Sequence, residues 1–91
     1  MDFGEALRAL KDGKRVARRG WPESMWLVLV SGSNIVVDAG RPLGKAAPHL
    51  VGGPVAYRPH IDKMREGEGM EPWAPTGGAL LAEDWEVRFW D

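Results

Sequence analysis

The chain has 91 residues, a formal net charge of −1 and no cysteine, and 44% of its residues are hydrophobic. This length predicts one domain over residues 1–91, with a limited core unless subunits share it. The near-neutral charge argues against binding to nucleic-acid polymers, the absence of cysteine excludes disulfides and cysteine-ligated zinc, and no apolar run approaches the roughly 20 residues of a membrane span.

The first segment is predicted to form a helix over residues 3–12. Asp2 and Glu5 resemble a capping box, and Gly13 is a natural stop. The apolar side chains that form its single stripe, at the spacing i, i+3, i+4 and i+7, are Phe3, Ala6, Leu7 and Leu10. No signal peptide is expected, because Met1 leads directly into this amphipathic segment. The absence of cysteine fits a reducing, cytoplasmic environment.

The remaining chain favours strands. The candidates are Arg15–Arg18, Met25–Val30, Ile35–Val37, Val55–Arg58 and Trp85–Phe89. Met25–Val30 is apolar on both faces, which indicates a central strand or one that a second subunit covers. Turn residues at 31–34 predict that Met25–Val30 and Ile35–Val37 form a hairpin. In the last strand Glu86, Arg88 and Trp90 are expected to share one face.

Two stretches, 38–54 and 65–78, are rich in glycine and proline and are predicted to be long irregular loops. One helix followed by four to six strands predicts the α+β class, with the helix packed on an antiparallel sheet. Charge is unevenly distributed, because residues 1–20 carry six Lys/Arg against three Asp/Glu and residues 62–91 carry three against eight. These regions either attract each other, within the fold or between subunits, or form two solvated faces.

Five tryptophans are more than so small a core buries easily, so some are expected at a subunit interface or in a ligand pocket. Arg18 and Arg19 lie just before Trp21. Guanidinium groups bind phosphate and an indole stacks on a base, which suits a nucleotide-like ligand. The alternative is a basic turn whose tryptophan anchors it to the core.

Three further sites, the segment 57–62, Trp73 and Asp84, carry side chains that could act in catalysis or in ligand binding. Tyr57 and Arg58 precede His60 and Asp62, a pair that is either an acid–base candidate or a set of hydrogen-bonding groups that fasten a turn. Trp73 lies between two prolines and either contacts a ligand or plugs its loop onto the core. Asp84 either accepts hydrogen bonds from ribose hydroxyls or caps its turn. No metal-ligand spacing is present.

Five segments occur in an order that is similar to the second Thoeris anti-defence family, a group of small phage and prophage proteins. They are Phe3-Gly4-Glu5-Ala6-Leu7, Gly13-Lys14-Arg15-Val16-Ala17-Arg18-Arg19-Gly20-Trp21, Tyr57-Arg58-Pro59-His60-Ile61-Asp62, Pro72-Trp73 and Leu80-Leu81-Ala82-Glu83-Asp84-Trp85-Glu86-Val87. Where family members often carry Ser-Gln-x-Asp after the Pro-Trp motif, this chain has Thr76-Gly77-Gly78-Ala79.

The resemblance implies a sponge that binds immune second messengers and leaves them intact in the bacterial host cytoplasm. The implied ligands are a glycocyclic ADP-ribose isomer and, at a separate site in some members, cyclic dinucleotides. The implied fold is a helix plus an antiparallel sheet, assembled as a dimer of dimers with pockets between protomers. No cofactor is implied.

The resulting hypothesis is a non-enzymatic, oligomeric binder of a cyclic nucleotide, most simply a tetramer, without catalytic or metal-ligating residues. The expected ligand-binding residues are Arg18, Arg19, Trp21, Trp26, Tyr57, Arg58, Trp73 and Asp84. One alternative is a small phosphodiesterase-like enzyme that uses His60 and Asp62. Another is a structural protein whose tryptophans only build the oligomer.

Overall fold

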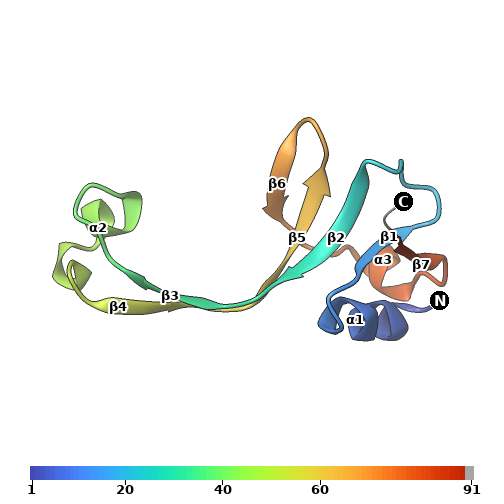
Figure 1. Ribbon diagram of the computed structural model, residues 1–91, viewed down its shortest axis with the longest axis horizontal. Coiled ribbons are helices and arrows are strands. Elements are labelled where there is room, and N and C mark those ends of the chain that lie inside the picture. The colour runs from blue at the N-terminus through green and yellow to red at the C-terminus, as the bar shows by residue number, and fades with distance from the viewer. Residues whose placement is uncertain (90–91) are drawn as a thin grey trace.

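The computed structural model describes residues 1–89, which form a helix-and-sheet body from which a long arm extends (Figure 1). The elements in chain order are α1 (Phe3–Lys11), β1 (Arg15–Arg18), β2 (Met25–Val30), β3 (Ser33–Val36), α2 (Pro42–Ala46), the 3-10 turn Pro48–Leu50, β4 (Pro54–Tyr57), β5 (His60–Arg65), β6 (Gly69–Pro72), α3 (Gly77–Leu81) and β7 (Trp85–Arg88). Helices with antiparallel strands confirm the predicted α+β class. Trp90, expected beside Glu86 and Arg88, lies outside the described residues.

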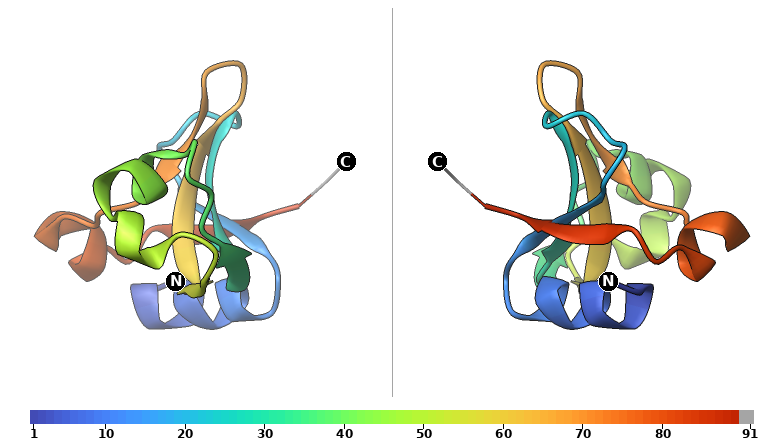
Figure 2. Two further views of the ribbon diagram at one scale, coloured as in Figure 1. Left: turned by 90° about the vertical axis from the view of Figure 1, so that its left-hand side faces the viewer. Right: turned by 90° about the vertical axis from the view of Figure 1, so that its right-hand side faces the viewer.

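The first helix forms where the apolar stripe predicted it. The Asp2 carboxylate accepts a hydrogen bond from the Glu5 backbone N–H at 2.8 Å, and the Glu5 carboxylate accepts one from the Asp2 N–H at 3.2 Å. This reciprocal pair satisfies donors that a helix N-terminus otherwise leaves open. Helix α1 lies against one face of the sheet (Figure 2), and its buried side chains Ala6, Ala9 and Leu10 belong to the core. No helix within residues 1–89 is long and apolar enough to cross a membrane.

The body is built on a five-stranded antiparallel sheet in the order β6-β5-β2-β1-β7. Strand β2 is central, as its doubly apolar sequence predicted. Leu27 faces α1 and is fully buried, and Trp26 on the opposite face is 8% exposed. Both faces of β2 are therefore largely covered within one protomer.

The predicted hairpin between residues 25–30 and 35–37 is wrong. Strand β2 pairs with β1 and β5, whereas β3 pairs with β4 in a separate two-stranded sheet. Residues 31 and 32 are a junction between the two sheets, not a reversal of direction. At this junction a Cβ on Gly32 would come within 2.9 Å of the Tyr57 carbonyl oxygen and of the Pro59 ring. Glycine thus permits the two chains to approach closely where body and arm meet.

The arm, residues 31–59, consists of the β3–β4 ribbon and a tip that contains α2 and the 3-10 turn (Figure 1). The prediction that 38–54 is irregular throughout is therefore wrong. The tip is closed by a hydrogen bond from the Val37 N–H to the Gly53 carbonyl and one from the Gly52 N–H to the Val37 carbonyl. Gly44 is buried there, and a Cβ at this position would collide with the Asp38 carbonyl.

The second predicted loop, 65–78, also contains regular structure. Strand β6 pairs with β5, and the short helix α3 follows it. Residues 60–62 form the first half of β5, which begins at His60. Residues 1–89 thus hold seven strands and three α-helices, more than the expected four to six strands and one helix. The pairing of Lys63 with Glu71 across β5 and β6 bears directly on the candidate site.

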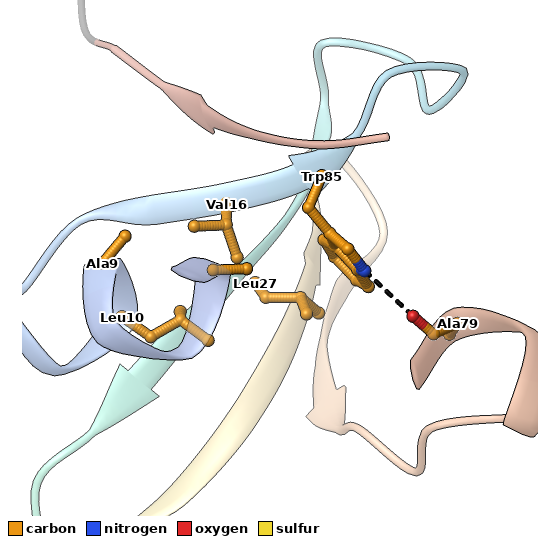
Figure 3. Packing of buried hydrophobic residues seen from close by; sticks show 7 residues of the cluster. Ala9, Leu10, Val16, Leu27, Ala79 and Trp85 are labelled. Carbon is orange, nitrogen blue, oxygen red and sulfur yellow. Dashed lines mark hydrogen bonds between the residues drawn. The ribbon is translucent and has the colours of Figure 1, made fainter. Parts of the chain in front are cut away.

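The core of the body lies between α1, the sheet and α3 (Figure 3). Its largest fully buried side chains are those of Trp85, Leu10, Leu27 and Val16. The Trp85 indole N–H donates a hydrogen bond of 2.9 Å to the Ala79 carbonyl. Because this bond satisfies the only polar group of the indole, Trp85 is buried without an unpaired donor and ties α3 to the sheet.

Candidate ligand-binding site

An open pocket of about 440 Å³ lies on the face of the sheet that α1 also occupies. Strands β1, β5 and β6 and the segment leading into α3 contribute its walls. The lining residues are Arg18, Trp21, Lys63, Glu71, Pro72, Trp73, Ala74, Thr76 and Ala79. Three residues that the sequence analysis selected, Arg18, Trp21 and Trp73, are therefore brought together, although they are distant in sequence.

The two pocket tryptophans both rest on the buried indole of Trp85. Trp21 meets it edge to face with ring centroids 5.5 Å apart, and Trp73 does so at 5.9 Å. Phe3 of α1 also packs on Trp73, at 5.6 Å. Such contacts hold the rings in fixed orientations while each indole keeps a partly open surface. The two readings of these residues, core anchor and pocket wall, are thus compatible.

Arg18 enters the pocket as one partner of an ion pair. Its Nε donates to Asp84 Oδ1 at 2.9 Å and its Nη2 to Oδ2 at 3.3 Å. The hydrogen bonds from Arg18 lower the pKa of the Asp84 carboxyl, and the carboxylate raises the pKa of Arg18. This pair joins the basic N-terminal and acidic C-terminal regions within the fold. The structure places the Asp84 side chain on Arg18, where it orients the guanidinium.

Three polar pocket residues, Lys63, Glu71 and Thr76, were missed by the sequence analysis. The Lys63 ammonium lies 4.5 Å from the centroid of a Trp21 ring. Glu71 forms an ion pair with Arg65 at 3.5 Å, and Thr76 accepts a hydrogen bond from the Ala79 N–H at 3.1 Å as the N-cap of α3. The alternation of Ile61, Lys63 and Arg65 along one strand face was the available signal, but it required β5 to be recognised as a strand.

Arg88 was missed as well, and it supports the pocket from behind. Its guanidinium donates hydrogen bonds to the carbonyls of Arg18 at 3.1 Å, Trp21 at 2.8 Å and Pro22 at 2.8 Å. Its side chain is 14% exposed and also contacts Glu86. One side chain of β7 thus closes the β1–β2 connection that carries Trp21. Sequence offered no signal for this role, because the partners are backbone atoms.

Two other selected residues lie away from the pocket walls. Trp26 is on the opposite face of the sheet, where its indole N–H donates to Glu66 at 3.2 Å and the Arg15 guanidinium lies 5.0 Å from its ring centroid. Arg19 has an exposed side chain, and its backbone N–H donates to the Asp84 carbonyl. Neither residue lines the 440 Å³ pocket.

Tyr57 and Arg58 belong to the arm. They border a shallower hollow of about 330 Å³ at the junction with the body. The Tyr57 ring meets His60 edge to face at 5.0 Å, and His60 Nε2 lies 3.4 Å from Asp62 Oδ2. The second nitrogen of His60 lies 3.0 Å from the Arg58 carbonyl. This cluster is separate from the walls of the Trp21–Trp73 pocket. Within residues 1–89, no group of His, Asp or Glu is arranged to hold a metal ion.

Comparison with known proteins gives a consistent result. The sequence profile of the Tad2-like family, described as a Thoeris anti-defense 2-like domain, matches residues 1–88. The chain is also 34% identical over 88 residues to Thoeris anti-defense 2 of Bacillus phage SP01, and the match covers 96% of this chain and 93% of that protein. Both similarities include the body, the pocket and the arm, and they confirm the resemblance found in the sequence.

Proposed function

Because this chain belongs to the Thoeris anti-defense 2-like family, we propose that it counters Thoeris defence as a sponge for a cyclic nucleotide signal. The ligand is a glycocyclic ADP-ribose isomer or a cyclic dinucleotide, and the protein holds it intact in the cytoplasm of the bacterial host. The observation that carries this proposal is the pocket in which two indoles and two cationic side chains converge.

The pocket has the size and chemistry that such a ligand needs. Its volume of about 440 Å³ falls within the roughly 300–1,000 Å³ typical of small-molecule sites. Trp21 and Trp73 offer aromatic surface to a base, and Arg18 offers a guanidinium that Asp84 already orients. Planar rings and phosphates are the two features that distinguish nucleotides, so this combination favours them.

Retention of an intact ligand is supported by the state of the polar pocket residues. Glu71 pairs with Arg65, and the Thr76 hydroxyl oxygen accepts the cap hydrogen bond of α3. These contacts engage the Glu71 carboxylate and the Thr76 oxygen in structural interactions. Ground-state affinity follows from such a site more readily than rate acceleration.

The proposed assembly is a homo-oligomer, a dimer of dimers, and its support lies in the arm. Ile35, Val36 and Tyr57 on the β3–β4 ribbon are 39%, 72% and 51% exposed. Association with further copies of the chain would remove this apolar surface from water. Light scattering at micromolar concentration is expected to give a multiple of the 10.0 kDa chain mass. A monomer would contradict the proposed assembly.

The sponge is tested by recovery of the ligand. A glycocyclic ADP-ribose isomer or a cyclic dinucleotide is mixed with excess protein, the free ligand is measured, and the complex is then heated and analysed by chromatography. The expected result is disappearance of the free ligand followed by its release unchanged.

The second candidate, a phosphodiesterase-like enzyme, is favoured only by the His60–Asp62 contact of 3.4 Å. It predicts a linear or hydrolysed product that accumulates with time and disappears in His60→Ala. No retention of any nucleotide tested would instead favour a purely structural oligomer.

A further inference from the structure

Lys63 occupies the surface on which a bound base would stack. Its ammonium lies 4.5 Å from the centroid of a Trp21 ring, and its side chain lines the same pocket. Strand β5 directs it there, because Lys63 is in register with the fully buried Leu27 on the α1 face of the sheet. A planar ligand that stacks on Trp21 at this point must therefore displace the ammonium.

The other charged residues of the pocket are already paired. Arg18 is bound to Asp84, and Glu71 is bound to Arg65. Among residues 1–89, the ion pairs within 4.0 Å do not include Lys63, although Glu71 faces it across the β5–β6 ladder. In the described part of the chain, Lys63 is thus the pocket cation whose charge no carboxylate neutralises at contact distance.

We propose that Lys63 is the anion-binding residue of this pocket. When the ring of the ligand stacks on Trp21, the Lys63 ammonium leaves the indole and binds a phosphate or pyrophosphate group of the same ligand. This inference deepens the proposed function and rests on it for the natural ligand. A single cation–π contact is a weak interaction, and the lysine stem is flexible. An ion pair with phosphate offsets its loss, whereas a neutral nucleoside provides no compensation.

The exchange makes Lys63 a determinant of ligand class. A ligand with both a planar ring and a nearby phosphate satisfies Trp21 and Lys63 together. A ligand with the ring alone leaves the displaced ammonium without a counter-charge, and one with the phosphate alone leaves the indole uncovered. Cyclic nucleotides and linear diphosphate nucleotides meet both requirements, whereas adenosine meets one.

The test uses four variants of the full chain and inorganic pyrophosphate as the probe, followed by ADP-ribose and adenosine. Lys63→Met removes the charge and keeps an apolar stem over Trp21, whereas Lys63→Arg keeps the charge. Lys14→Met removes one positive charge from an exposed position outside the pocket and is the matched control. Binding is followed by calorimetry and by tryptophan fluorescence, with Trp21→Phe used to assign the signal and thermal unfolding used to verify the fold.

We expect pyrophosphate and ADP-ribose to bind the native protein and Lys14→Met alike. Lys63→Met should weaken both by roughly tenfold or more, and Lys63→Arg should keep most of the affinity. Adenosine should bind Lys63→Met at least as tightly as the native protein, because its ring then displaces no unpaired ammonium. The proposal is overturned if Lys63→Met binds pyrophosphate and ADP-ribose with the same affinity as the native protein. It is also overturned if the native protein binds neither ligand.

These outcomes are separable from the failure of the sponge. Cyclic signals that are not retained, together with Lys63-dependent pyrophosphate binding, would leave the anion site standing and remove the proposed function. Retention of a cyclic signal with the same affinity in native protein and Lys63→Met would leave the sponge standing and remove the role of Lys63.

Discussion

The body and the arm cover their apolar side chains in different ways. In the body, Trp85 and Leu27 are at most 1% exposed, because α1 and α3 close over the sheet. In the arm, Val36 is 72% exposed and only the ribbon partner and a small tip provide contacts. A two-stranded ribbon is marginally stable by itself. The comparison teaches that the body contains its own core, whereas the ribbon of the arm leaves apolar side chains exposed.

The largest expected effect belongs to the centre of the body. Trp85→Ala removes the indole that packs on Trp21 and Trp73 and donates to Ala79. We expect it to lower the free energy of unfolding by about 3–5 kcal/mol, as for other buried aromatic truncations. Urea denaturation measures the loss. Leu81→Ala, at an 84% exposed position, is the control and should change stability by at most ~0.5 kcal/mol. Equal effects would contradict the assignment of the core.

The next effect concerns the connection between β1 and β2. Arg88→Met removes the donors to the carbonyls of Arg18, Trp21 and Pro22. We expect a loss of about 1.5–3 kcal/mol in stability, together with weaker ligand binding because Trp21 is no longer held. Arg88→Lys should retain only part of the stability and of the ligand affinity, since an ammonium cannot reproduce the planar fork of the guanidinium. Arg19→Met, at an exposed position, is the matched control. Stability and binding that match those of the control would show that Arg88 does not position Trp21.

Binding in the body is tested at Trp73, on the segment between β6 and α3 that lines the pocket. Trp73→Ala should weaken binding of a cyclic nucleotide by roughly 1–3 kcal/mol for the base that stacks on it. Some stability is also lost, because Trp73 packs on Phe3 and Trp85. Calorimetry at a temperature where the variant remains folded separates the two effects, and Trp26→Phe on the opposite face is the comparison. Full affinity in Trp73→Ala would remove this loop from the site.

The arm is expected to affect association and leave the body intact. Val36→Asp places a carboxylate on the exposed surface of β3 and should weaken self-association at least tenfold, about 1.4 kcal/mol. Unfolding of the body should remain unchanged. Light scattering across a dilution series measures the association, and Leu81→Asp introduces the same charge at an exposed position of the body. If both variants associate like the native chain, the arm surface is not the interface.

The smallest effect is the contribution of the Arg18–Asp84 pair to the pH dependence of stability. Arg18 hydrogen bonds hold the pKa of Asp84 below its ordinary value of 3.8 in the folded state. The stabilisation is therefore present above pH of about 4 and is lost as the pH falls through the lowered pKa. In thermal unfolding, Asp84→Asn should not show the loss of stability that this pair causes as the pH falls. Glu83→Gln should show the same loss as the native protein. Parallel pH profiles for native protein and Asp84→Asn would show that the pair contributes nothing.

Local sequence signals determined part of this protein. The apolar stripe and the Asp2–Glu5 capping box placed α1, and the doubly apolar run 25–30 indicated a central strand. Charge and aromatic content at Arg18, Trp21 and Trp73 selected residues that the fold brings to one pocket. These signals succeed because helix periodicity, capping and strand burial depend on neighbours within a few residues.

Only the tertiary structure decided which strands pair and which side chains meet. The partner of β3 is β4 and not β2, because pairing is set by contacts between residues distant in the chain and by the close approach at Gly32. Lys63 reaches Trp21 because β5 runs beside β2, and Arg88 holds the Trp21 connection through backbone carbonyls that carry no sequence signature. Sequence spacing cannot report such contacts, since their free energy arises only after the strands have taken their register.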